Sequence, residues 1–131
     1  NLENLISDYA YYADIKRWLA SDQYVDYICP QIYWGFQHPT AGFERIADQW
    51  AKLCKDSPVK LYIGIGVYRA GHEEGDSPSE QKEWKSDADV LKKQVEYGRK
   101  KKADGFAFFD YRDLIGHAAK DAVNQLKTVL K

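Results

Sequence analysis

The chain lacks several features that would assign it to a special class of protein. Its 131 residues include no Met, even at position 1, which is typical of a processed or excised chain. No apolar run approaches the roughly 20 residues of a membrane-spanning helix. The N-terminus has no basic segment ahead of an apolar one, the pattern of a signal peptide. We therefore expect no membrane span, and we expect any signal peptide to have been removed.

Cysteine is scarce, and neither sign of charge is in excess. Two Cys are too few for a disulfide framework, and we expect Cys29 and Cys54, both within apolar patterns, to be buried thiols. Nineteen Lys and Arg balance twenty Asp and Glu, and the net charge of −1 favours neither nucleic acid nor an anionic membrane as a partner. With 44% hydrophobic residues the chain is not disordered, and its length fits one domain rather than two.

Aromatic residues, in contrast, are abundant, and helix and strand patterns alternate along the chain. Ten Tyr, four Trp and five Phe suggest stacking surfaces. Apolar residues at helical spacing, and covered runs of β-branched and aromatic residues, predict the order α-β-α-β-α-β-α. The predicted helices span 9–20, 43–54, 86–102 and the C-terminal segment, and the predicted strands span 25–34, 60–68 and 106–111. The last helix should bury Ala122, Val123, Leu126, Val129 and Leu130.

Three local features refine this pattern. Pro30 cannot donate a ladder hydrogen bond, so the pairing of the first strand should end or bulge there. The second strand has two different faces. One face carries the branched residues Leu61, Ile63, Ile65 and Val67, which suit packing against helices. The other carries Tyr62, Gly64, Gly66 and Tyr68, and its glycines leave room for another group. Residues 69–85 are predicted to be one polar loop, of a length that usually has a function.

The connections between the predicted strands are long enough for crossover helices, which predicts a parallel α/β sheet with right-handed crossovers. Three strands cannot close a (β/α)8 barrel by themselves. The chain is therefore either a small open sheet or part of a (β/α)8 barrel. In both architectures, ligands bind beyond the carboxyl ends of the strands.

Aromatic and hydrogen-bonding residues follow each predicted strand at that end. They are Gln31, Tyr33 and Trp34, then Tyr68 and Arg69, then Asp110, Tyr111 and Arg112. Rings stack on the CH faces of a sugar, and amide, carboxylate and guanidinium groups bind its hydroxyls, so the mixture suits a carbohydrate ligand. The alternative is that the aromatic residues only cap the core and keep a polar tip in water.

Asp110 is the candidate catalytic residue, because a carboxylate directly after Phe-Ala-Phe-Phe must be paired, catalytic or bound to a ligand. The structural alternative is a salt bridge to Arg112 or Arg69. Glycosidic hydrolysis normally needs two carboxyl groups. No second carboxylate adjoins a strand end, so the partner would come either from the acidic loop, with Glu73, Glu74 and Asp76, or from polypeptide outside this chain.

Motifs for other chemistries are incomplete. Gly64-Ile65-Gly66 lacks the third glycine of a dinucleotide fingerprint, and no Cys or Ser stands in a nucleophile motif. The three His lie on separate segments without metal-ligand spacing. The basic run 99–102 falls in the last turn of a predicted helix, where cations complement the helix dipole. We expect no metal and no cofactor.

The sequence resembles a known family at the residues singled out above. The resemblance lies in Tyr12-Ala13-Asp14, Trp18-Leu19, the run from Val25 to Trp34 with its Pro-Gln-x-Tyr-Trp end, Trp50, Leu61-Tyr62-Ile63-Gly64 with Tyr68, Gln94, and Gly105-Phe106 with Phe109 and Tyr111. In order and spacing these residues resemble the later part of the bacterial glycosyl-hydrolase-like barrels, a family long catalogued as a domain of unknown function. The similarity runs from about Tyr9 to Leu114.

The resemblance implies a (β/α)8 barrel in cell-envelope or secreted proteins, acting on glycans that include peptidoglycan glycan strands. Residues 1–131 would then be one partial domain, the C-terminal half of the barrel with its sixth, seventh and eighth strands. The family's Asp-Asp-Tyr-type acidic motif has no counterpart here, and the family more often has a small hydroxyl residue at the position of Asp110. By resemblance, Gln31, Tyr33, Trp34 and Tyr68 line a sugar cleft and position the substrate.

We therefore expect part of a glycosidase-like cleft whose principal acid and base lie upstream, in a chain that is inactive alone. Because an incomplete barrel exposes sheet edges and an apolar inner face, we expect self-association or docking with the missing N-terminal half. One alternative is a non-catalytic sugar-binding module with the same aromatic residues. Another is a flavodoxin-like protein that binds a nucleotide or flavin, for which the Gly/Ser/Thr-rich phosphate loop is missing.

Overall fold

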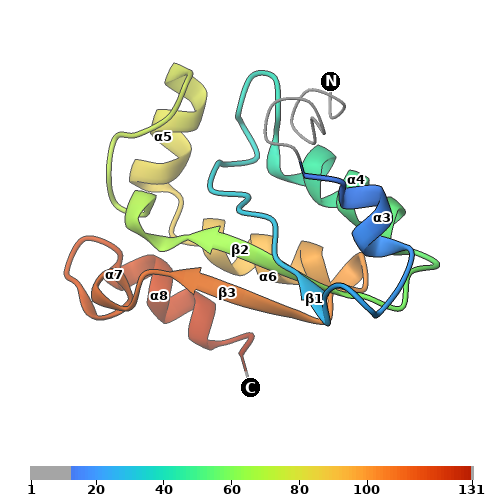
Figure 1. The fold of residues 1–131 in the computed structure, drawn as a ribbon. Coiled ribbons are helices and arrows are strands. Elements are labelled where there is room, and N and C mark those ends of the chain that lie inside the picture. Colours follow the sequence, from blue (N-terminus) through green and yellow to red (C-terminus); the bar gives the residue numbers. More distant parts are fainter. Residues whose placement is uncertain (1–12, 131) are drawn as a thin grey trace.

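The structure is a computed structural model that describes residues 13–130 (Figure 1). It contains three strands and the helices that connect them. The helices are α3 (Ile15–Leu19), α4 (Phe43–Cys54), α5 (Pro78–Ser86), α6 (Val90–Lys100), α7 (Tyr111–Ile115) and α8 (Lys120–Lys127), with a 3-10 turn, η1, at Val67–Arg69. The strands are β1 (Tyr27–Ile28), β2 (Lys60–Gly66) and β3 (Gly105–Phe109). The first part of the helix predicted over 9–20 lies outside the described residues.

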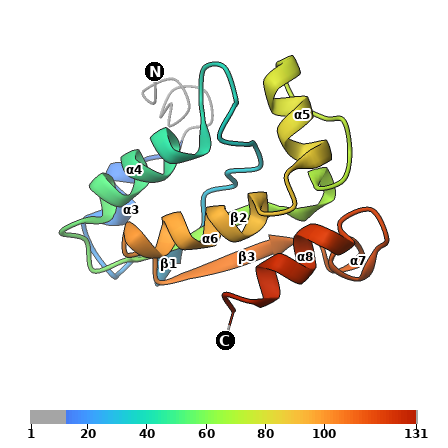
Figure 2. The ribbon, with the colours of Figure 1, turned by 180° about the vertical axis from the view of Figure 1, so that it is seen from behind.

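The strands form one parallel sheet in the order β1-β2-β3, as predicted. Tyr62 pairs with Gly105 and Gly66 pairs with Phe109, so β2 and β3 end level with each other. Figures 1 and 2, which show the two sides, place α6 and α8 on one face of the sheet, while no described helix covers the other face. We call this second side the open face.

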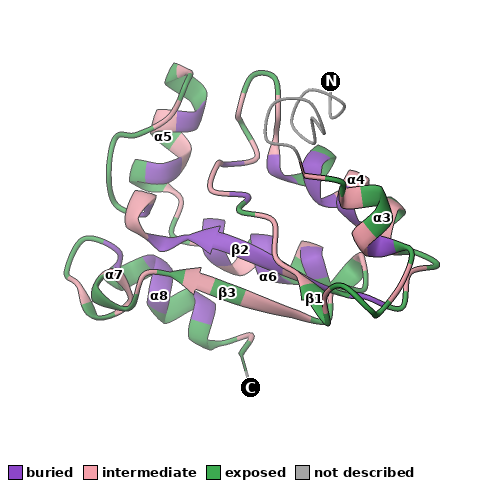
Figure 3. Ribbon diagram, viewed as in Figure 1, coloured by how far each residue is buried: buried purple, intermediate pink, exposed green. Residues whose placement is uncertain are grey.

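The core lies between the sheet and the helices that cover it (Figure 3). The predicted inward set of β2, Leu61, Ile63, Ile65 and Val67, is buried there. Burial of a side chain of this size contributes about 1.5–3 kcal/mol, which makes these residues the main support of the sheet. A side-chain atom at Gly98 would lie 2.6 Å from the ring of Phe106, so this glycine lets α6 approach β3 closely.

The strand predicted over 25–34 is much shorter, because Pro30 interrupts it. Regular pairing is confined to Tyr27–Ile28. Beyond the proline, one bridge joins Gln31 to Gly64, where the Gly64 amide donates to the Pro30 carbonyl and the Ile32 amide donates to the Gly64 carbonyl. The predicted break at Pro30 is confirmed, and residues 33–42 leave the sheet as a loop.

The prediction that residues 69–85 form one loop is wrong, because they contain most of α5. Ser77 caps the helix by accepting a hydrogen bond from the Glu80 amide, and Pro78 occupies the first turn, where its missing N–H costs nothing. Ser86 is the last residue of α5 and does not open the next helix, which begins at Val90. Because α5 has almost no apolar residues, it lacks the apolar periodicity that predicts a helix.

The C-terminal part differs from expectation in small ways. The third strand ends at Phe109, and Tyr111 begins the short helix α7 instead of extending the strand. In and after α8, Ala122, Val123 and Leu126 are buried as predicted, whereas Leu130 lies beyond the helix end and is exposed. Both Cys are half-buried free thiols, less buried than expected. Within 13–130 no helix has the length and apolar character needed to cross a membrane.

Candidate functional site

Three aromatic rings meet where the strands end. The Tyr33 and Phe109 rings are stacked, with centroids 5.7 Å apart and planes at 20°. The Tyr68 ring meets both edge-on, at 6.1 Å from Tyr33 and 6.4 Å from Phe109. Tyr33 follows β1, Tyr68 follows β2, and Phe109 is the last residue of β3. We call these three residues the aromatic cluster. The structure thus brings two of the predicted residues together and adds Phe109, which is 53% exposed.

The register explains why Phe109 belongs to this site. Side chains alternate between the two faces of a strand, and paired residues of parallel strands share a face. Phe109 pairs with Gly66, which belongs to the glycine-containing face of β2, so its ring lies on the open face. The sequence contained this signal, because Phe109 is the last residue of an alternating strand directly before Asp110.

Gly66 makes room for the cluster. A side-chain atom at this position would lie 2.9 Å from the Tyr68 ring and 3.1 Å from the Tyr33 Cβ. The glycines predicted to leave space on this face therefore accommodate Tyr33 and Tyr68 of the chain itself. Burial raises the pKa of Tyr33, so its hydroxyl stays protonated at neutral pH and can donate a hydrogen bond.

Polar groups surround the cluster. Gln31 is exposed, and its bridge to Gly64 places it on the open face. The Arg69 guanidinium carbon lies 5.5 Å from the centroid of the Tyr68 ring, a cation–π contact. The Arg69 Nε is buried and has no hydrogen-bond partner among the described residues. Gln31 and Arg69 supply the amide and guanidinium donors expected next to the rings.

Trp34 packs against the core, unlike Tyr33, which stacks on Phe109. The Trp34 side chain is half-buried, and its ring centroid is 5.7 Å from that of His38. Its indole Nε1 is buried without a hydrogen-bond partner in the described part of the chain. Its carbonyl oxygen accepts a hydrogen bond of 3.1 Å from the amide of Gln94, a fully buried residue of α6.

Asp110 forms a local ion pair with Arg112, which was the predicted structural alternative to a catalytic role. Its Oδ1 caps α7 by accepting from the amides of Arg112 (2.8 Å) and Asp113 (3.4 Å), and its Oδ2 is 2.9 Å from Arg112 Nη2. The hydrogen bond from the Arg112 side chain holds the pKa of Asp110 below its usual range. An ionised carboxylate can act as a base or nucleophile but not as a proton donor. Tyr111 is 71% exposed at the start of α7.

The acidic loop residues proposed as a second carboxylate are mostly paired. Glu73 forms an ion pair with Lys85, and Asp76 Oδ2 lies 2.9 Å from His38 Nε2. Glu74 is exposed. The catalytic role predicted for Asp110, and that of any partner from this loop, remain predictions.

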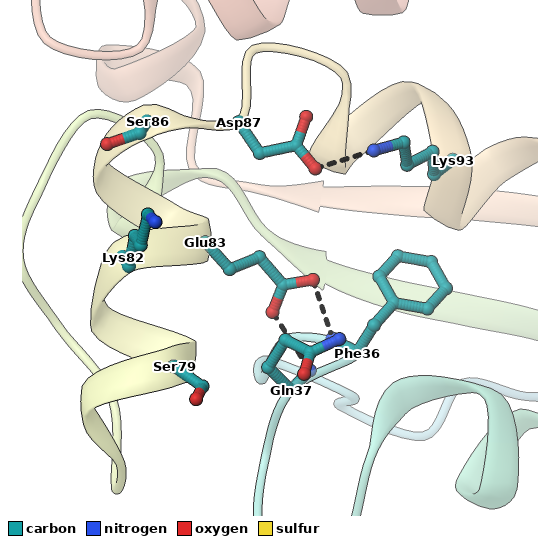
Figure 4. A pocket seen from close by; sticks show the side chains of 8 residues that line it. All are labelled: Phe36, Gln37, Ser79, Lys82, Glu83, Ser86, Asp87 and Lys93. Carbon is teal, nitrogen blue, oxygen red and sulfur yellow. Dashed lines mark hydrogen bonds and ion pairs between the residues drawn. The ribbon is translucent and has the colours of Figure 1, made fainter.

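Two further carboxylates, not singled out from the sequence, lie on α5. Glu80 is fully buried, and Glu83 is half-buried. Glu83 lines an open pocket of about 590 Å³ between α5, the start of α6 and the loop at Phe36 (Figure 4). Desolvation by burial raises the pKa of Glu83. The Ser-x-x-Glu spacing from Ser77 to Glu80, a capping-box pattern, was the available sequence signal.

The described residues contain no cluster of three or more His, Cys, Asp or Glu side chains suited to a metal ion. The site thus consists of aromatic rings with amide, guanidinium and carboxylate groups. Its chemistry is that of stacking and hydrogen bonding.

A parallel sheet with helices on one face and an aromatic, polar site beyond its strand ends defines an α/β protein of the half-barrel type. Comparison with known proteins is more specific. The family model described as glycosyl hydrolase-like 10 matches residues 3–86, and the chain belongs to this family. It is therefore a glycosidase-like protein, and its three strands and connecting helices agree with the TIM-barrel-like fold of the family. The similarity noted over 87–114 lies outside this match.

Two similar proteins are named as glycosyl hydrolases. Glycosyl hydrolase DigH of Escherichia coli K12 is 38% identical over 87 residues, which are 65% of this chain and 19% of DigH. Glycosyl hydrolase YngK of Bacillus subtilis 168 is 41% identical over 58 residues, 44% of this chain and 11% of YngK. The matched part thus spans less than a fifth of either relative.

Proposed function

We propose that this chain forms one side of a glycan-binding cleft in a barrel that hydrolyses O-glycosidic bonds of bacterial cell-wall or related glycans. The aromatic cluster carries the proposal, because three rings gathered beyond the strand ends, with amide and guanidinium donors beside them, suit a sugar ring. The chain belongs to a glycosyl-hydrolase-like family, which supports the same function.

The main catalytic acids would lie upstream, outside this chain. Among the described carboxylates near the strand ends, Asp110 is paired with Arg112, and Glu80 and Glu83 accept hydrogen bonds from backbone amides. Each is engaged within the chain, whereas a retaining or inverting glycosidase needs two carboxyl groups facing the scissile bond. The chain alone would then bind glycan but not cleave it. A secreted or cell-envelope location follows from the proposed substrate.

The open face would in turn be covered by the upstream part of the barrel. Tyr27 and Phe109 on this face are 57% and 53% exposed, which is unusual for large side chains of a sheet. The proposed partners of the chain are thus a glycan and either the N-terminal half of the barrel or a second copy of the chain.

The experiment that tests this function is mass-spectrometric detection of cleavage of peptidoglycan-derived and chitin-type oligosaccharides. The chain alone is compared with a polypeptide that also carries the upstream half. Cleavage only in the longer polypeptide supports the proposal. Cleavage by the chain alone, lost in Asp110→Asn, would instead place the chemistry on Asp110.

The second candidate function is a sugar-binding module without catalysis. It is favoured by the engagement of Asp110, Glu80 and Glu83 in contacts within the chain. It predicts glycan binding that Trp34→Ala abolishes, but no cleavage by either polypeptide.

A further inference from the structure

The loop that follows β1 is tethered at five consecutive residues, and the tethers come from distant parts of the chain. The segment is Trp34, Gly35, Phe36, Gln37 and His38, which we call the tethered loop. The partners of these tethers lie on α5, on the residues just before α5, or on α6, and the Gly35 carbonyl also accepts from the Phe43 amide at the start of α4. Loops are ordinarily the mobile part of such a fold, so this density of contacts requires a reason.

Two glutamates of α5 make the central contacts. Glu80 Oε1 accepts from the Gly35 amide at 2.9 Å, and its Oε2 accepts from the Asp76 amide at 2.9 Å. Glu83 Oε1 accepts from the Phe36 amide at 3.1 Å, and its Oε2 accepts from the Gln37 amide at 3.0 Å. Figure 4 shows the Glu83 side chain pointing from α5 to these two residues. All four carboxylate oxygens are thus used on backbone amides.

The remaining tethers flank this pair. The Gln94 side chain donates to the Trp34 carbonyl at 3.1 Å, the Ser77 hydroxyl donates to the Gln37 carbonyl at 3.2 Å, and His38 Nε2 lies 2.9 Å from Asp76 Oδ2. On the loop, Gly35 leaves the space that the Glu83 carboxylate occupies, because any side chain at this position would collide with it.

Burying these carboxylates has a cost. Removing a carboxylate from water is unfavourable, and only good hydrogen bonds offset it. Glu80 is fully buried, and desolvation raises the pKa of Glu83. A helix as polar as α5 needs no inward carboxylates merely to fold, since the fully buried Trp84 already anchors it to the core. The two carboxylates fix the backbone that immediately follows Tyr33.

We propose that Glu80 and Glu83 are positioning residues that hold the tethered loop so that Tyr33, which directly precedes it, stays in the aromatic cluster as part of a preformed sugar-binding surface. This inference rests on the proposed function. A preformed surface loses less conformational entropy when ligand binds. Weakening the tethers should therefore lower glycan affinity without removing any side chain that touches the glycan.

The first measurement follows the tethers themselves, without ligand. In NMR spectra of the full chain, the amide proton shifts of Phe36 and Gln37 should change as Glu83 takes up a proton, with a midpoint above the usual glutamate value of about 4.3. Glu83 is faced by the carboxylates of Glu80 and Asp87, and Asp87 in turn pairs with Lys93 of α6. In Glu83→Gln this titration should disappear, and in the control Glu74→Gln, an exposed residue before α5, it should persist.

The second measurement is the affinity for a chitin-type tetrasaccharide by calorimetry. In Glu83→Gln one oxygen becomes an amide nitrogen that faces a backbone N–H, so one tether is lost. We expect affinity to fall about tenfold, because a loop with one tether fewer spends a smaller fraction of its time in the binding conformation, and the apparent affinity falls by that fraction. Wild-type affinity should also fall as the pH drops through the midpoint at which Glu83 takes up a proton, as measured from the amide proton shifts. The affinity of Glu83→Gln should not change over the same pH range. A merely structural role would leave that pH profile flat in both proteins.

Gly35→Ala tests the same contact from the loop side and does not depend on the folding of a glutamate variant. It should weaken tetrasaccharide binding about as much as Glu83→Gln. The positioning role is overturned if the amide titration disappears in Glu83→Gln while affinity and its pH profile match those of Glu74→Gln. If the wild type does not bind the tetrasaccharide at all, the proposed function fails and the positioning role fails with it, while the amide titration still reports whether the tethers exist.

Discussion

The Tyr33 ring stacks on the Phe109 ring, with centroids 5.7 Å apart, and so joins the loop after β1 to the end of β3 across the whole sheet. The Tyr33 side chain also lies next to Gly66 of the central strand, which pairs with Phe109. Because stacked aromatic pairs hold a fixed geometry, this contact aligns the outer strands' ends into one surface.

Phe109→Ala should weaken glycan binding about tenfold. The substitution removes an exposed ring from the aromatic cluster and leaves Tyr33 without its stacking partner, a loss of about 1.4 kcal/mol. Calorimetric titration with a chitin-type tetrasaccharide measures the effect. Tyr27→Ala is the matched control, because Tyr27 pairs with the Tyr62 ring at the opposite end of the strands. Equal losses in both variants would show that the cluster has no special part in binding.

Gly66→Ala should destabilise the fold by about 1–3 kcal/mol, the usual range for overpacking. Its methyl group would lie 2.9 Å from the Tyr68 ring and must displace that ring or Tyr33. Urea unfolding measures the change, and glycan affinity should fall with it. Ala107→Ser is the control. Ala107 lies on β3, on the same face of the sheet as Gly66, but it is exposed, so the substitution should leave stability and glycan affinity unchanged. Unchanged stability in Gly66→Ala would mean that the rings are not packed as described.

Much of the fold was predictable because strongly apolar, periodic segments determine it. The inward set of β2, and α4 from Phe43 to Cys54, were predicted correctly, since burial of such residues dominates folding. The first strand was predicted over 25–34 because its composition favours a strand up to Trp34. The predicted break at Pro30, which lacks the N–H that a ladder needs, was correct, but regular pairing covers only Tyr27–Ile28.

The parts that could not be predicted are those held by polar contacts between distant residues. Helix α5 has one buried apolar residue, Trp84, and its other buried side chain is the charged Glu80, which apolar periodicity excludes from a core. Its partners lie about 45 residues away in the loop after β1. Phe109 is a different case. Its place at the end of an alternating strand was visible in the sequence, but only its pairing with Gly66 shows that its ring shares a face with the glycines of β2.

Asp110→Asn should reduce stability at neutral pH and have little effect in strong acid. The pKa of Asp110 is lower in the folded chain than its usual value, so its ionised form stabilises the fold above that usual value. This contribution is lost as the pH falls through the lowered pKa. Urea unfolding of both proteins at neutral pH and at about pH 2 measures the difference. A constant difference at both pH values would show that the ion pair with Arg112 does not stabilise the chain.

Cys54 should react slowly with iodoacetamide in the folded chain. Desolvation by burial raises its pKa to about 11, so at pH 8 about one thiol in a thousand is ionised, against about a quarter for a free cysteine. Labelling followed by mass spectrometry, with and without denaturant, gives the ratio of rates. Burial also raises the pKa of Cys29, so Cys29 should react more slowly in the folded chain than a free cysteine does. Fast labelling of Cys54 in the native chain would contradict the burial of its thiol.

The open face predicts association of the isolated chain. Tyr27 and Phe109 expose more than half of their surface there, and an uncovered apolar face of a sheet favours contact with another chain. Sedimentation velocity should show a coefficient that rises with concentration, and Tyr27→Lys should suppress the rise by placing a charge on that face. Ile115→Lys is the control, because Ile115 is 68% exposed but lies on α7, outside the sheet. If the wild type stays monomeric at every concentration, the open face does not need a partner, and a barrel half that docks there loses its main support.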